Sequence, residues 1–189
     1  SFGQTIRTSL HTTLEAGSWI WKTPLPLGIL LASMVLDNVI RQFLTIASAY
    51  WSVIDLPLAT FGLVASGMSL MGYFVPRVAK YLAETRTPTQ NFCLLCIILM
   101  LGLLGIAEAF PYWGILPAIL LYSTMQAMNY LASRYLNEHA PSEKRATVLS
   151  FRGLSTNVSY GAVSLLYSSL IAWIKTQEDK APWFRPERN

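Results

Sequence analysis

The chain has 189 residues, of which 53% are hydrophobic and 13% are Asp, Glu, Lys or Arg, roughly half the charged fraction of an average soluble domain. The net charge of +4 is not gathered in a basic stripe with interleaved aromatic residues, which argues against nucleic-acid binding. The two cysteines, Cys93 and Cys96, lie in an apolar run and supply no disulfide framework. This composition is typical of a protein whose main solvent is lipid.

Five apolar segments of about 18 to 24 residues alternate with more polar connectors. A helix needs about 20 residues to cross a hydrocarbon core about 30 Å thick. Backbone polar groups must be paired in lipid, so segments of this length must be helical, and the strict alternation of β-barrel strands is absent. The sequence therefore predicts an all-α fold, a polytopic bundle of five membrane-spanning helices at residues 27–50, 58–75, 92–110, 113–131 and 154–174.

Proline residues mark the expected ends of these segments. Pro24 and Pro26 precede the first, Pro57 separates the first two, Pro76 closes the second, and Pro111 divides the third from the fourth. Proline lacks a backbone N–H, so it is tolerated at helix starts and in connectors better than inside a helix.

Basic residues are distributed unevenly between the two faces of such a bundle. Nine lysines and arginines lie on the face of the N-terminus, including those of connectors 76–91 and 132–153, whereas the two short loops opposite carry none. By the positive-inside rule, the N-terminus and both long connectors are predicted to face the cytoplasm. Four basic residues beyond residue 174 fall on the opposite face. We expect the chain to lack a sixth helix; the alternative is a span count that is wrong by one.

The chain is expected to comprise three parts. Residues 1–22 form a cytoplasmic linker, in which residues 5–21 are weakly amphipathic and fit an interfacial helix about as well as a plain linker. Residues 23–174 form the five-helix bundle, and residues 175–189 form a polar tail.

The first apolar segment contains two polar pairs, Asp37–Asn38 and Arg41–Gln42. Asp37 lies about 15 Å into the segment, and the i, i+4 spacing lets Asp37 and Arg41 meet on one helix face. An ionisable group at this depth costs on the order of a few kcal/mol or more and usually faces a cavity or a partner. We predict a solute- or proton-binding site in which Asp37 takes up a proton and Arg41 stabilises its charge or holds an anionic group. A permanent ion pair that joins two helices is almost as well supported.

Polar residues at helical spacing form one stripe in the fourth segment and one in the fifth: Tyr122, Gln126, Asn129 and Ser133, and Asn157, Tyr160, Ser164 and Tyr167. Such stripes could line an aqueous path and supply hydrogen bonds to a solute. The same residue types also hold membrane helices together. The candidate solute contacts are Tyr122, Gln126, Asn129, Asn157 and Tyr160.

Signals for catalysis are weak. Gly67 and Ser69 match the short GxSx pattern of intramembrane serine proteases, but that chemistry needs a histidine within the bilayer, and His11 and His139 lie outside the apolar segments. The CxxC spacing of the two cysteines has no second pair and no nearby histidine, and no phosphate-binding loop is present. We therefore expect no enzyme activity, no metal site and no cofactor.

The end of the second segment reads GYFVPRVAK at residues 72–80. It resembles the cytoplasmic loop signature of the major facilitator superfamily, G-x-x-x-D-[RK]-x-G-[RK]. Gly72, Arg77 and Lys80 match, whereas Pro76 stands where the family has Asp and Ala79 where it has Gly.

Two further stretches resemble bacterial members of the same superfamily. Residues 36–51 resemble the seventh helix, and residues 135–161 resemble the loop that leads into the eleventh, with the basic residues Lys144 and Arg145 after Pro141. The resemblance covers residues 1–174 and implies that the five segments are helices seven to eleven of a twelve-helix protein of the bacterial inner membrane.

The resemblance implies secondary active transport of a small solute by alternating access, typically coupled to protons. The implied partners are the solute, protons, the lipid bilayer and the N-terminal half of the same transporter, with no nucleic acid. Gly72, Arg77, Lys80 and Arg145 would tune a cytoplasmic gate. The alternatives are a membrane structural or assembly subunit and, less well supported, an intramembrane enzyme.

Overall fold

The computed structural model describes the backbone of residues 2–180 and the side chains of residues 11–177. This part of the chain is all-α, as predicted, with short 3-10 turns at two connectors. The elements are α1 (Phe2–Lys22), α2 (Pro24–Val53), η1 (Leu58–Thr60), α3 (Phe61–Thr85), α4 (Pro88–Ala107), α5 (Ile115–His139), η2 (Ser142–Lys144) and α6 (Arg145–Lys180). Most of the predicted polar tail lies outside the described residues.

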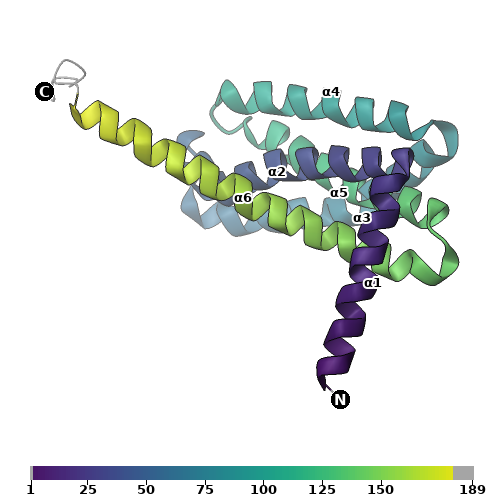
Figure 1. The fold of residues 1–189 in the computed structure, drawn as a ribbon. Helices are drawn as coiled ribbons and strands as arrows, with labels where there is room; N and C mark the ends of the chain where they lie inside the picture. The colour runs from purple at the N-terminus through teal and green to yellow at the C-terminus, as the bar shows by residue number, and fades with distance from the viewer. Residues whose placement is uncertain (1, 181–189) are drawn as a thin grey trace, which may run out of the picture.

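Helix α5 lies at the centre of the bundle and packs against α2, α3, α4 and α6 (Figure 1). Helix α1 runs steeply away from the bundle and contacts α2 and α6. Helix α6 crosses the bundle obliquely, and its C-terminal part projects beyond the other helices (Figure 1). Its 36 residues span about 54 Å at 1.5 Å per residue.

Within the described part of the chain, four helical segments are long and apolar enough to cross a membrane: Pro24–Val53, Leu58–Thr85, Pro88–Ala107 and Ser142–Gln177. The fourth predicted span, residues 113–131, lies almost entirely within the helix α5, but α5 is not among these four, so the count of five is not reached. Helix α5 is enclosed by four neighbours, and a helix that faces protein instead of lipid can carry more polar residues. Its buried Thr124 and half-buried Gln126 and Asn129 are such residues.

The prediction that Pro76 closes the second span is wrong, because α3 continues through Pro76 to Thr85. Proline removes one intrahelical hydrogen bond, the one to the carbonyl of Gly72, and the bonds on either side of it still hold the helix. The polar connectors are likewise largely helical: α5 extends to His139 and α6 begins at Arg145.

The connectors alternate between the two ends of the bundle as the charge count requires. At one end, the backbone N–H of Tyr112 donates to the carbonyl of Ile54 at 2.9 Å, joining the two short loops. Asp55 and Tyr112 adopt left-handed backbone conformations there, with φ of 59° and 58°. The α1–α2, α3–α4 and α5–α6 connectors lie at the other end (Figure 1).

The helix starts follow from local sequence. Thr87 caps α4 through a capping box with Gln90: the Gln90 backbone N–H donates to the Thr87 hydroxyl at 3.3 Å, and the Thr87 N–H donates to the Gln90 side chain at 3.1 Å. Pro88 and Pro24 occupy first positions of α4 and α2, where no N–H is needed.

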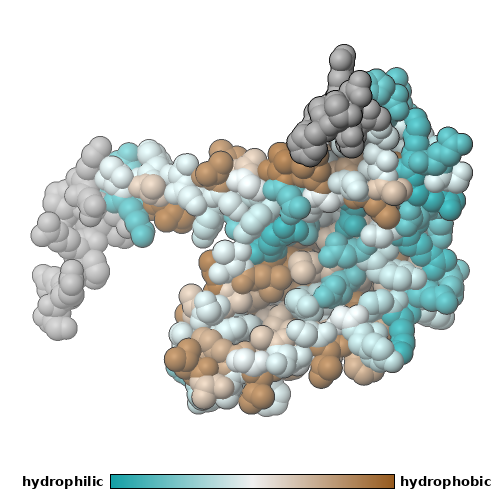
Figure 2. Space-filling model, turned by 90° about the horizontal axis from the view of Figure 1, so that it is seen from below, coloured by the Kyte–Doolittle hydropathy of each residue, from teal (hydrophilic) through white to brown (hydrophobic). Residues whose placement is uncertain are grey.

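Large apolar side chains cover the outer faces of α3, α4 and α6. Exposed examples are Leu63, Leu70, Tyr73, Phe74, Ile97, Leu101, Leu104, Leu154, Leu165, Leu166 and Trp173. Figure 2 shows that hydrophilic residues gather at the end of the bundle opposite the direction in which α6 projects, whereas hydrophobic residues are frequent over the rest of this face. An apolar belt with one strongly polar end fits insertion in a bilayer.

A fully buried amide joins three helices at the polar end. Asn91 of α4 donates to the carbonyl of Leu82 on α3 at 2.9 Å and to the hydroxyl of Tyr135 on α5 at 2.7 Å. Replacing Asn91 by leucine is expected to destabilise the protein by about 1–3 kcal/mol, because the buried Tyr135 hydroxyl loses its partner. Thermal unfolding in detergent measures this. The neighbouring exposed Thr89→Ala change is the control and should have little effect; equal losses for both would contradict the assignment.

Candidate functional site

The predicted pair of Asp37 and Arg41 lies near the middle of α2. The Arg41 Nη2 atom lies 2.8 Å from one carboxylate oxygen of Asp37 and donates a hydrogen bond of 2.9 Å to the other. The Asp37 side chain is 2% exposed and the Arg41 side chain 33% exposed. The ion pair is thus formed within one helix, with its acid buried and its base at the edge of the bundle.

Arg41 extends this pair to α6. Its Nη1 atom donates to the Asn157 side-chain oxygen at 2.9 Å, and its guanidinium lies 5.0 Å from the centre of the Tyr160 ring. The first contact is a hydrogen bond and the second a cation–π attraction, and both hold the guanidinium against α6. Arg41 is therefore shared between Asp37 and the polar stripe predicted on the last segment.

Two more side-chain contacts join the same helices. Asn38 donates to the Ser159 hydroxyl at 2.7 Å, and the hydroxyls of Thr45 and Tyr160 lie 2.7 Å apart. We call the residues of this contact the α2–α6 polar cluster: Asp37, Asn38, Arg41, Thr45, Asn157, Ser159 and Tyr160. Three side-chain hydrogen bonds and one cation–π contact thus join α2 to α6 at their crossing.

Arg152 is the main residue that the sequence reasoning missed. It was counted in a cytoplasmic connector, but it lies inside α6 and points at α5. Its Nη1 donates to the Ser133 hydroxyl at 3.0 Å, and its Nη2 donates to the Asn129 side-chain oxygen at 2.8 Å and contacts the Met128 sulfur at 3.5 Å. Its helical spacing to Thr156 and Ser159 was the available signal.

The polar residues predicted as one stripe on the fourth segment take part in two separate groups of contacts. Asn129 and Ser133 bind Arg152, whereas Gln126 donates to the Tyr122 hydroxyl at 2.9 Å. Tyr122 lines a cavity of about 270 Å³ between α2, α3 and α5, together with Leu44, Ala47, Trp51, Ala65, Met68 and Ser69. Tyr122 and Gln126 therefore do not join the α2–α6 polar cluster.

Three remaining candidates have no such contacts. The Gln42 amide nitrogen and the Ser164 hydroxyl are buried without a hydrogen-bond partner. Tyr167 is 50% exposed in the C-terminal half of α6. The polar stripe of α6 is thus used at Asn157 and Tyr160 and left free farther along the helix.

The predicted gate residues make separate local contacts: Arg77, Lys80 and Arg145 lie toward the polar end, whereas Gly72 lies near the middle of α3. The Arg77 guanidinium stacks 3.9 Å from the centre of the Tyr73 ring on the same helix, and Lys80 is exposed. Arg145 donates to the Ala140 carbonyl at 3.4 Å. Gly72 faces α5, because a methyl group placed on it would lie 3.6 Å from the Gln126 amide nitrogen.

No group of three metal-binding side chains occurs among the described residues. Ser69 donates to the Ala65 carbonyl, and the side chains that line its cavity include no histidine. His139 contacts the Tyr135 carbonyl through Nδ1 at 2.8 Å. The geometry assembles polar groups for binding and ion pairing at the α2–α6 crossing.

No protein family, no curated protein and no solved structure matches the chain.

Proposed function

We propose that this chain is a membrane-embedded part of a secondary transporter of the major facilitator type, which moves a small solute by alternating access. The observation that carries the proposal is the buried Asp37–Arg41 pair, near the middle of a helix long and apolar enough to cross a membrane, at its crossing with α6. Charged side chains at such a depth are energetically costly, and those that occur usually mark the pathway of a solute or an ion.

Proton coupling would operate through Asp37. Protonation would neutralise its carboxylate and weaken its attraction for Arg41, which would keep its contact with Asn157 and become free to bind a solute. Helices α2 and α6 are joined here by a few side-chain hydrogen bonds. The loss of one of these hydrogen bonds would therefore weaken the association of the two helices. This is the type of coupling between protonation and helix movement that alternating access requires.

The polar end, with the gate candidates Arg77, Lys80 and Arg145, would face the cytoplasm of a bacterial cell, because the α3–α4 and α5–α6 connectors and the residues beside them are rich in lysine and arginine. The exposed apolar faces of α3 and α6 would contact lipid or the N-terminal half of the transporter. Solute, protons and that other half are the proposed partners.

The transport proposal is tested in proteoliposomes loaded with a pH-sensitive dye. The protein, with any segments that flank it in its gene product, is exposed to gradients of a sugar, an amino acid, a dicarboxylate and a cationic drug. We expect one class to change the internal pH, and Asp37→Asn to reduce that change by about tenfold or more, since the variant cannot exchange a proton at this position.

Glu108→Gln is the matched control, because it also neutralises one carboxylate but lies exposed in the α4–α5 loop. It should leave the flux unchanged. Flux that is equally retained in Asp37→Asn and Glu108→Gln would remove Asp37 from the coupling mechanism, and no solute-dependent flux for any class would remove the transport proposal.

A structural or assembly subunit is the second candidate. It is favoured by the apolar stretches of α3 and α6, in which 6% and 0% of the residues are buried within the bundle. Their exposed apolar side chains could contact other proteins of a complex. In that case no solute should produce flux, and Asp37→Asn should impair assembly with the partner proteins, measured by gel filtration.

A further inference from the structure

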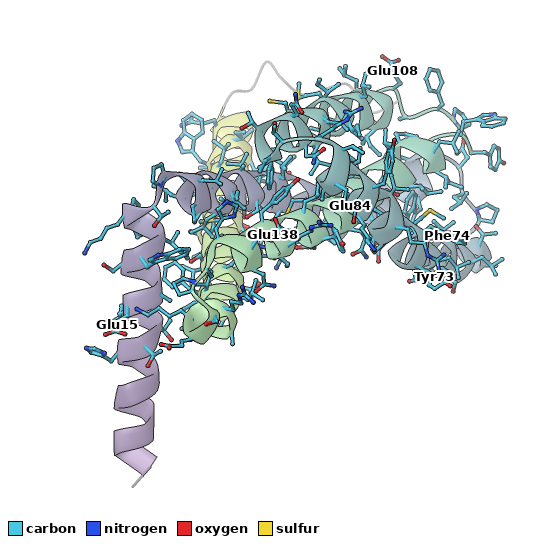
Figure 3. All side chains as sticks on the ribbon, turned by 90° about the vertical axis from the view of Figure 1, so that its right-hand side faces the viewer. Glu15, Tyr73, Phe74, Glu84, Glu108 and Glu138 are labelled. Atoms are coloured by element: carbon cyan, nitrogen blue, oxygen red, sulfur yellow. The ribbon has the colours of Figure 1, made fainter. Side chains whose placement is uncertain are left out.

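The charges at the meeting point of α2, α5 and α6 do not balance, although Asp37 is buried and the two arginines there are half-buried. Asp37 is the buried carboxylate of the described side chains; the other acidic ones are exposed, namely Glu15, Asp55, Glu84, Glu108, Glu138 and Glu143. Figure 3 shows Glu15 and Glu108 pointing away from the helices. Two guanidinium groups, those of Arg41 and Arg152, interact electrostatically with this one carboxylate. The region therefore carries a net positive charge.

The hydrogen-bond partners of Arg152 are neutral. Its two terminal nitrogens donate to Ser133 and Asn129, and its Nε atom is buried without a partner. Asp37 is close enough to interact electrostatically with Arg152, but its hydrogen bond goes to Arg41. A buried charge that lacks a paired counter-charge is unfavourable, because its hydration is lost without compensation. The site therefore favours whatever brings a negative charge to Arg152.

Hydrogen-bond donors are also in surplus here. The side-chain oxygens of Asn129 and Asn157 accept from Arg152 and Arg41, so each asparagine keeps its amide NH₂ group as a donor. Two guanidinium groups and two amide donors suit a carboxylate or phosphate, because arginine presents a planar fork to paired oxygens. In Figure 2, hydrophilic residues lie on the surface in the angle between the projecting helix α6 and the bundle.

We propose that a small anionic solute, a carboxylate or a phosphate, binds between α2, α5 and α6, with Arg152 as its main counter-charge and Arg41 as its second. This inference rests on the proposed function and narrows the solute class of the permease to anions. The bound anion supplies the negative charge that the described residues lack, and it competes with Asp37 for Arg41.

Binding is measured with the purified chain in neutral detergent by isothermal calorimetry. The probes are succinate, citrate and inorganic phosphate at constant ionic strength, with succinamide as the uncharged control. We expect at least one anion to bind and succinamide not to bind. Arg152→Gln should weaken the anion affinity by about tenfold to a hundredfold, since a charge-assisted hydrogen bond is lost. Arg86→Gln, an exposed arginine of the α3–α4 connector, should leave it unchanged.

A second variant keeps the proposal testable if Arg152→Gln fails to fold. Asn129→Asp places a carboxylate about where the Asn129 oxygen accepts from Arg152, at 2.8 Å. It supplies the missing charge from within the protein. We expect the thermal midpoint without ligand to rise by about 2–4 °C and anion binding to be lost. A midpoint that falls while anions still bind would overturn the proposal.

Further outcomes separate this proposal from the transport proposal. Anion binding that depends on Arg152, without flux of any solute, would support the anion site and contradict transport. Flux of a sugar or a cation without anion binding would support transport and overturn the anion site. Competition between the anion probes and lipid is tested by comparing nanodiscs of phosphatidylglycerol with nanodiscs of phosphatidylcholine. If phosphatidylglycerol occupies the site and none of the soluble anions does, the bound anion is a lipid headgroup and the solute assignment is wrong.

Discussion

Replacing Asp37 by alanine is expected to destabilise the folded protein by about 3–5 kcal/mol, because it leaves Arg41 and Arg152 buried or half-buried with no carboxylate nearby. In a chain of this length each kcal/mol corresponds to about 2–4 °C in the thermal midpoint, so the midpoint should fall by roughly 6–20 °C. Thermal unfolding of the purified protein in detergent, followed by circular dichroism, measures the change.

The double variant Asp37→Ala with Arg41→Leu identifies the cause. If the loss comes from an unpaired guanidinium, removing Arg41 as well should recover part of the stability that Asp37→Ala costs. Glu108→Ala removes an exposed carboxylate and should change stability by no more than about 0.5 kcal/mol. A double variant that is less stable than Asp37→Ala by the full cost of Arg41→Leu alone would show that the two residues are independent.

Replacing Gly102 by leucine is expected to cost about 1–3 kcal/mol through overpacking between α4 and α5. A methyl group at Gly102 would lie 2.5 Å from Leu121 Cδ2 and 3.0 Å from its Cγ. Leu121 is fully buried, so it cannot move aside freely. Gly105 makes a similar close approach to Pro117. Small residues at one helix face let membrane helices pack closely.

Gly67 of α3 provides the matched control for this prediction. It lies inside a candidate span, and a methyl group there would meet nothing within 4 Å. Gly67→Leu should be neutral or slightly stabilising, because leucine has the better helix propensity by about 0.8 kcal/mol or more. Equal destabilisation by both changes would mean that close packing against Leu121 is not the cause.

The helical character of the chain and much of its element order were predictable. Long apolar segments can satisfy their backbone only as helices in lipid, and Pro24 and Pro88 give the first positions of α2 and α4. Pro76 was misleading, because whether a proline ends or merely interrupts a helix depends on the packing on either side of it. The apolar character of α5 was overestimated for a related reason: its polar residues face neighbouring helices.

The candidate site was predictable in part. The i, i+4 spacing of Asp37 and Arg41 was sufficient to predict their ion pair, since this distance is fixed by the helix itself. Their contact with Asn157 and Tyr160, more than a hundred residues away in sequence, depends on how α2 and α6 cross. A basic residue near the start of an apolar segment is typical of a cytoplasmic connector, so the sequence predicted a connector position for Arg152.

The sequence alone determined which residues are apolar, where basic residues gather, and that an acid and a base share one turn of a helix, because these are properties of composition and of spacing below about four residues. The tertiary structure decided which helix is enclosed, which polar stripes meet, and that two arginines share one buried carboxylate. Those facts depend on the directions of helix axes, which short-range spacing does not encode.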